Sequence, residues 1–270
     1  MTLDIRPACL EEMPILVDWA AAEGWNPGLA DAMAFHAADP EGFLLGVLDG
    51  VPVGCVSAVR QGDSHGFIGF YMIRPEHRGK GFGIAMWRAA MARLAGRNVG
   101  LDGVLAQQAN YARSGFGLAW RNVRHGAEAP RPVAGAEGEL RAASLEDALA
   151  LDVFPVERRG FLQAWLAAPG HRALAVPGRG FGVIRPCRNG QKIGPLMARD
   201  DAAARAIFNA LIEGVSGPVF LDLPEPNKAA LALAGEAGLE ASFETARMYT
   251  GAVPALDLAA CYGLASFELG

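Results

Sequence analysis

The chain has 270 residues, of which 51% are hydrophobic and 20% charged, and its formal net charge is −5. This composition can bury a core and excludes an intrinsically disordered chain. The mild negative charge and the absence of a long block of Lys and Arg argue against a nucleic-acid partner. The length favours two domains, at roughly 150 residues per domain.

The chain carries no apolar run suited to targeting or to a membrane. Charged residues stand near the N-terminus where a signal peptide needs apolar ones, and no uncharged stretch of about 20 residues is apolar enough to span a bilayer. The four cysteines are far apart and form no CxxC pair, which is typical of reduced thiols and indicates no metal site. We therefore expect a cytoplasmic protein with no membrane partner.

The first half reads as an alternating α/β unit. An opening strand at 3–8 is followed by a helix at 10–23 and a short helix ending at Phe35. Strands at 43–48 and 51–59 flank Asp49-Gly50, a strong hairpin signal, and a third strand covers 65–73. A helix at 84–94, a strand at 99–105, a short helix at 110–114 and a last strand towards 124 complete the order β-α-α-β-β-β-α-β-α-β.

Residues 127–138 are rich in Pro, Gly and Ala and read as a linker between domains at 1–126 and 139–270. The pattern then begins again, since 140–147 echoes 5–12. Strands fit at 173–176, 180–185, 191–197, 219–223 and 243–249, and helices at 202–213 and 227–237. We interpret this half as a diverged copy without the glycine-rich segment; the alternative is that any two α/β units of this length look alike.

The glycine-rich segment between strand 65–73 and helix 84–94 carries the chemistry. Gly79, Gly81 and Gly83 are spaced by two and flanked by Arg78 and Lys80. Glycine lets the backbone approach a ligand, and the unpaired amides and dipole of the following helix attract an anion such as a pyrophosphate. The spacing matches neither a P-loop nor a dinucleotide fingerprint. Alone, it also fits a structural turn.

Residues 71–85 strongly resemble motif A of the GNAT acetyltransferase superfamily. Six residues fall on pattern positions: Ile73, Pro75, Arg78, Gly79, Gly81 and Gly83. The resemblance implies an α/β (α+β) fold, with a mixed, mostly antiparallel sheet flanked by helices, and acetyl-CoA as co-substrate. It also implies that the backbone of Met72 and Ile73 pairs with the pantetheine arm. The pyrophosphate would bind the amides of Gly79, Lys80, Gly81, Phe82, Gly83 and Ile84. The charges of Arg78 and Lys80 would add to this attraction unless both side chains only face solvent.

A second segment, 110–116, matches the place where the family carries a tyrosine near the cofactor thiol. There Tyr111 would donate a proton to the departing thiolate; the alternative is packing against pantetheine. Asn110 is a candidate cofactor contact, although family members often place an Asn earlier. The base is not identified, because the strand before the loop has no acid. His65, a chain of waters and Glu41 remain open.

Segments along the whole chain resemble a bacterial two-domain GNAT subgroup: residues 25–28, 69–71, 108–111, 194–196, 223–227 and 262–268. The resemblance implies that the second, GNAT-like domain shapes an acceptor pocket. Arg185 and Lys192 would suit an acceptor carboxylate. The other candidate wall residues are Trp25, Asn26, Asn189 and Asn227. We expect an N-acetyltransferase that acts on a primary amine of a small molecule by direct attack on the thioester, without a metal. A non-catalytic acyl-CoA sensor and a protein lysine or N-terminal acetyltransferase are the alternatives.

Overall fold

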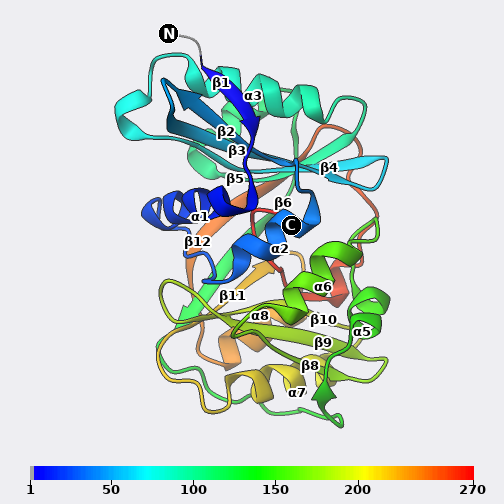
Figure 1. The fold of residues 1–270 in the computed structure, drawn as a ribbon. Helices are drawn as coiled ribbons and strands as arrows, with labels where there is room; N and C mark the ends of the chain where they lie inside the picture. Colours follow the sequence, from blue (N-terminus) through cyan, green and yellow to red (C-terminus); the bar gives the residue numbers. More distant parts are fainter. Residues whose placement is uncertain (1–2) are drawn as a thin grey trace.

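A single 13-stranded sheet runs through the whole protein in the computed structural model, which describes residues 3–270 (Figure 1). Its order is β1-β2-β3-β4-β5-β12-β6-β11-β10-β9-β8-β7, with β13 paired to β10. The strands of the first half are β1 (Asp4–Pro7), β2 (Phe43–Leu48), β3 (Val51–Gln61), β4 (His65–Ile73), β5 (Asn98–Val104) and β6 (Gly117–Ala127). Those of the second half are β7 (Arg141–Ala142), β8 (Arg172–Val176), β9 (Gly180–Pro186), β10 (Gln191–Ala198), β11 (Val219–Pro224), β12 (Glu240–Tyr249) and β13 (Cys261–Gly263).

The helices repeat in the same order in both halves. The first half has α1 (Met13–Ala22), α2 (Asp31–Ala38), α3 (Phe82–Arg93) and α4 (Gln108–Arg113). The second half has α5 (Leu145–Leu151), α6 (Arg159–Ala167), α7 (Asp201–Ile212) and α8 (Lys228–Glu236). Each half therefore reads β-α-α-β-β-β-α-β-α-β, which confirms the predicted repeat and the mixed, mostly antiparallel fold. No helix among residues 3–270 is both long and apolar enough to cross a membrane.

Local sequence signals account for most of the first half. Helix α1 buries its predicted stripe of Met13, Leu16, Val17 and Ala20, which lie on one face at helical spacing. The hairpin between β2 and β3 turns at Asp49-Gly50, where both residues have positive φ, as this two-residue turn requires.

Strands β4 and β5 are paired over only part of their length. They run parallel from His65 opposite Asn98 to Ile68 opposite Leu101, and no pairing joins them beyond that point within the described chain. The register between β3 and β4 shifts just after this point, and Phe70 takes a positive φ. The bulge bends β4 away from β5 and leaves the β5-facing edge of residues 69–73 open.

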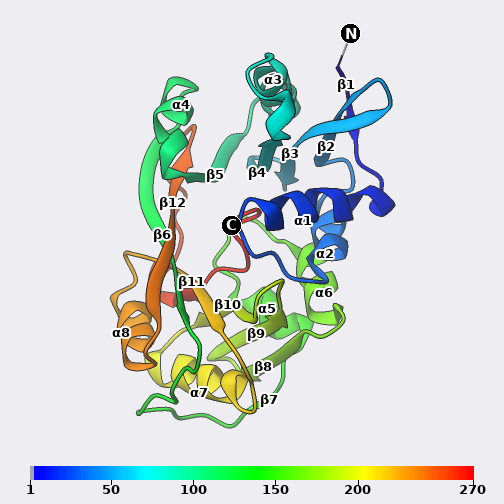
Figure 2. The ribbon, with the colours of Figure 1, turned by 90° about the vertical axis from the view of Figure 1, so that its left-hand side faces the viewer.

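The two halves exchange their last strands. Strand β12 of the second half pairs with β5, and β6 of the first half pairs with β11. Figure 2 shows β6 and β12 running side by side along the molecule, with α1 and α2 between the strands of the two halves. The segment predicted as a linker begins with the end of β6 and then follows the second half, where Val133 is buried and bonded to Asn209. One continuous sheet therefore joins both halves.

The second half has the same divergence between its central strands, but the chain itself fills it. Strands β10 and β11 pair in parallel only from Gln191 to Ile193, and β13 then pairs with β10 in the gap. At the start of α7, the position that corresponds to the glycine loop, the Asp200 carboxylate accepts the amide of Ala203 at 2.9 Å. A carboxylate thus occupies the anion position of this half, as expected from its lack of glycines.

After β13, residues 264–270 form the C-terminal segment, which returns to the first half. The C-terminus lies in the middle of the molecule in both views (Figures 1 and 2). The amide of Leu264 donates to the carbonyl of Asp222 at 2.7 Å, and Gln61 of β3 donates to the carbonyl of Leu269 at 3.2 Å. These bonds hold the C-terminal segment between β11 and β3.

Candidate active site

A pocket of about 440 Å³ opens where β4 and β5 diverge. At one end it reaches the glycine loop, through Gly79 and Gly83, and it then passes Met72 and Tyr111. At the other end it is lined by residues of the second half: Phe243, Thr245, Phe267 and Glu268. The pocket therefore connects the predicted anion site to a chamber that both halves build.

The glycine loop presents unpaired amides. Gly79 and Gly81 have φ of +74° and +83°, a left-handed conformation that glycine adopts without strain, and α3 begins at Phe82. Within residues 3–270, no hydrogen bond engages the amides of residues 79–84. Together with the dipole of α3, these amides fit a pyrophosphate.

The two basic side chains of the loop fasten it to neighbouring residues. The Arg78 guanidinium donates to the carbonyl of Ile73 at 2.8 Å and forms an ion pair with Glu23, and Lys80 donates to the carbonyl of Glu76 at 2.8 Å. Both side chains remain exposed, so their charges stand beside the anion site as well as stabilising the turn.

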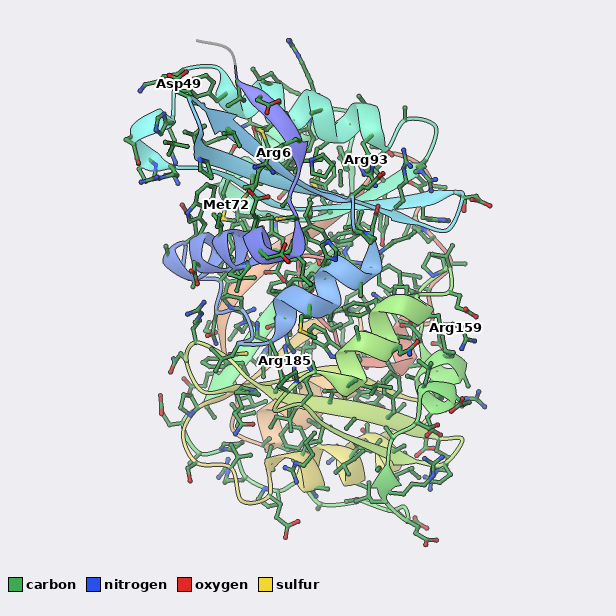
Figure 3. All side chains as sticks on the ribbon, viewed as in Figure 1. Arg6, Asp49, Met72, Arg93, Arg159 and Arg185 are labelled. Atoms are coloured by element: carbon green, nitrogen blue, oxygen red, sulfur yellow. The ribbon has the colours of Figure 1, made fainter. Side chains whose placement is uncertain are left out.

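The open edge of β4 continues from this loop into the pocket. Met72 and Ile73 pair with β3 on one side, and both line the pocket. Figure 3 labels Met72 at this edge of the first half. A strand edge without a partner fits an extended ligand that pairs with the backbone, as was predicted for the pantetheine arm.

Tyr111 lies in the pocket wall, across the gap from β4. Its ring packs on Trp87, with the centroids 5.6 Å apart, and covers Gly103 of β5, where a side chain would clash with it. Burial raises the pKa of Tyr111 to about 12, so the phenol keeps its proton at neutral pH. Asn110 of the same helix is exposed and does not line the pocket, whereas Gln107 does.

Two buried polar residues of the second half line the pocket. Thr245 of β12 is 2% exposed, and its hydroxyl has no hydrogen-bond partner within residues 3–270. Glu268 of the C-terminal segment is 8% exposed, and burial raises the pKa of its carboxyl. The sequence analysis assigned neither residue a role. A signal for Glu268 exists, because it is the only charged residue in the otherwise apolar and small run 261–269.

Both base candidates that the sequence left open lie away from the pocket. His65 begins β4 and bonds to the neighbouring Ser64 at 2.8 Å. Glu41 is exposed and approaches Arg93 at 3.5 Å. Neither residue lines the pocket, so the interpretation of either as the direct base is wrong.

The expectation that Arg185 and Lys192 bind an acceptor carboxylate is also wrong. Arg185 is fully buried, pairs with Asp31 at 2.9 Å and lies between α2 and the second-half sheet (Figure 3). Lys192 is buried 3.4 Å from Asp222, which Arg124 also grips through two hydrogen bonds of 2.6 and 2.7 Å. Although burial opposes it, this pair of cations holds the pKa of Asp222 well below its ordinary value. These charges join the halves instead of binding a ligand.

Of the remaining wall candidates, one lines the pocket and the others make structural contacts. Trp25 lines the pocket as predicted. Asn26 bonds to the backbone of Asn189 in both directions, at 3.0 and 2.8 Å. Asn227 caps α8 by accepting the amide of Ala230 at 3.0 Å. Apart from Trp25, these residues make structural contacts and do not line the pocket.

Comparison with known proteins agrees with this geometry. Two family models match: the acetyltransferase (GNAT) family over residues 10–116 and an acetyltransferase (GNAT) domain over residues 147–263. A protein named holothin acyltransferase, from Pseudoalteromonas sp. (strain SANK 73390), is 32% identical over 98% of this chain and 94% of its own length.

Solved structures agree on the fold. A putative acetyltransferase from Pyrococcus horikoshii superposes with a TM-score of 0.85 at 22% identity, covering 99% of this chain and 96% of that one. A tandem GNAT protein from the clavulanic acid biosynthesis pathway gives a TM-score of 0.62 at 15% identity, covering 94% and 100%. By its sequence relatives and its duplicated fold, the chain belongs to the GNAT acetyltransferase family as an acyltransferase with two GNAT domains.

Proposed function

We propose that the protein transfers an acetyl group from acetyl-CoA to the primary amine of a small molecule. The observation that carries the proposal is one continuous pocket from the glycine loop to residues of the second half. A pyrophosphate at the loop amides and a pantetheine arm along the open edge of β4 would bring the thioester into this pocket, beside Tyr111.

The reaction forms a C–N bond and breaks a C–S bond. The sulfur leaves as a thiolate and needs a proton, and Tyr111 is a protonated phenol in the wall of the pocket. Tyr111 is therefore the proposed general acid of the step.

The shape of the pocket favours a small acceptor over a protein side chain or N-terminus. Phe243 and Phe267 line the end that lies away from the glycine loop, and Trp25 contributes a third aromatic wall. Concave pockets that combine aromatic walls with polar groups are typical of small-molecule sites, whereas peptides bind along extended grooves or strand edges.

Turnover is favoured over acyl-CoA sensing by the relative named holothin acyltransferase, which matches nearly the whole chain. The test is steady-state release of the CoA thiol from acetyl-CoA in the presence of a panel of aliphatic and aromatic primary amines. We expect at least one amine to raise thiol release well above the rate of hydrolysis, with a matching acetylated product by mass spectrometry. A protein that binds acetyl-CoA in calorimetry but releases no thiol with any amine, peptides included, would be a sensor.

A further inference from the structure

Strand β4 has no carboxylate at the first-half site. The C-terminal segment supplies one, from Glu268. A β-carbon placed on Gly69 of β4 would lie 2.5 Å from the carbonyl oxygen of Glu268 and 3.0 Å from its Cα. The C-terminal segment therefore crosses β4 directly, at the bulge next to Phe70, where only a glycine leaves room. Glu268 of this segment lines the same pocket as Tyr111.

We propose that Glu268 is the catalytic base, which receives the acceptor as an ammonium ion and takes its proton before the amine attacks the thioester. This inference rests on the proposed function. The free lone pair then forms the C–N bond as the C–S bond breaks. Tyr111 gives its proton to the departing sulfur, and the second proton of the nitrogen returns to the Tyr111 oxygen, which restores the phenol. The proton held by Glu268 then leaves to solvent. One proton is thus released per turnover, as the conversion of an ammonium ion and a thioester to an amide and a thiol requires.

The Glu268 carboxylate is free to take a proton from the acceptor. Glu268 takes part in none of the salt bridges found among residues 3–270, because the nearby cations are already engaged. Arg124 binds Asp222 with two hydrogen bonds and gives its third to the carbonyl of Trp25 at 2.8 Å. The guanidinium of Arg124 also stacks 5.2 Å from the ring of Phe267, which fixes the residue next to Glu268.

A second polar group supports an acceptor at this end of the pocket. Thr245 is buried without a hydrogen-bond partner among the described residues and lines the same chamber. An unpaired buried hydroxyl costs free energy unless a ligand or water satisfies it. We assign it to a polar atom of the acceptor, whose apolar body contacts Phe243 and Phe267.

The titration of Glu268 depends on several neighbouring groups. Burial raises the pKa of its carboxyl, Asp31 adds to this effect, and Lys192 and Arg124 oppose it. A carboxyl with a raised pKa is a stronger base than an exposed one and can hold the proton that it takes. Three charged groups act on the carboxyl: Asp31 of α2, Arg124 of β6 and Lys192 of β10. The other titratable residues that line the pocket are Glu23, Tyr71 of β4, Arg78, Asp102 of β5 and Tyr111 of α4.

The test compares full-length wild type with Glu268→Gln and Glu268→Asp, using acetyl-CoA and the best amine from the panel. We expect Glu268→Gln to lower kcat/KM by about 100-fold or more at pH 7. The pH profile should also change its shape. The kcat/KM of the wild type should level off above the pKa of Glu268. The kcat/KM of the Gln variant should rise tenfold per pH unit until the free amine predominates. Glu268→Asp keeps a carboxylate and should restore part of the rate and the plateau.

Glu240→Gln is the matched control, because Glu240 is an exposed carboxylate of β12 outside the pocket. It should leave both rate and profile unchanged. All variants should bind acetyl-CoA with wild-type affinity in calorimetry, which separates a lost base from a misfolded site. Gly69→Ala, which pushes the C-terminal segment away from β4, should lower kcat/KM in the same way while Glu268 is still present.

The outcomes separate the two proposals. An active wild type with a Glu268→Gln variant of equal rate and equal pH profile overturns the base assignment and leaves acetyl transfer intact. A wild type that binds acetyl-CoA but transfers to no amine overturns the proposed function, and the role of Glu268 with it.

Discussion

Replacing Arg247 with alanine leaves a buried carboxylate without its cation at the junction of the two halves. Arg247 of β12 grips Asp102 of β5 through two hydrogen bonds of 2.7 and 2.6 Å, and Asn122 of β6 donates a third at 2.7 Å. The side chains of Arg247 and Asp102 are 1% and 0% exposed. Removing one partner of such a pair costs about 3–5 kcal/mol, because the remaining charge stays desolvated.

The assay is urea unfolding followed by circular dichroism, with thermal melting as a second readout. For a chain of 270 residues, a loss of about 3–5 kcal/mol lowers the melting temperature by about 5–9 °C. Arg121→Ala is the matched control, because Arg121 of β6 also pairs across to β12, with Glu244 at 3.3 Å, but both side chains are about 35–43% exposed. That pair should contribute at most about 1 kcal/mol.

The double variant Asp102→Asn with Arg247→Met tests the cause. Removing both charges together should cost less than Arg247→Ala alone, since no unpaired charge is left in the sheet. If Arg247→Ala destabilises the protein no more than Arg121→Ala does, the exchanged strands are not held by this buried pair and the reasoning is refuted.

Three further predictions concern the site and the pH dependence. Gly81→Glu should weaken acetyl-CoA binding at least about tenfold by calorimetry, because it brings a negative charge to the anion site; Gly96→Glu, at an equally left-handed glycine in a distant turn, controls for backbone strain, and equal losses would remove the loop assignment. Tyr111→Phe should lower kcat at least about tenfold with little effect on acetyl-CoA affinity, and an unchanged kcat would reduce Tyr111 to packing. Burial, with Arg185 nearby, lowers the pKa of His171 to about 4, so the unfolded chain binds a proton there first. The free energy of unfolding should therefore fall as the pH drops from about 6.5 towards 4. In His171→Gln, urea unfolding should show a shallower fall, and an unchanged slope would contradict the assignment.

Local features predicted most of the elements and the anion site. The hairpin at Asp49-Gly50, the stripe of α1 and the glycine loop depend on neighbours within a few residues, so their signals are complete in the sequence. The second half followed because it repeats the same order, although α5, α6 and β13 were not predicted.

Long-range pairing was not predictable. The alternation of β12 suits any neighbouring strand, and nothing local distinguishes β5 from β11 as its partner. Arg185 meets Asp31, 154 residues earlier, so a charge that read as a ligand contact is a structural pair. Glu268 was missed for the same reason, because its position depends on how the C-terminal segment crosses β4.

Because the gap of the second half is filled by its own chain, different parts of the sequence build the proposed donor and acceptor sites. Strand β13 plugs that gap, and the chain leaving it carries Phe267 and Glu268 straight into the chamber of the other half. Under the proposed function, substitutions among the lining residues between 243 and 268 would change which amine is accepted and leave the proposed CoA-binding residues at 72–84 unchanged. The second unit, whose own gap is filled by β13, would thereby set the acceptor specificity of the first.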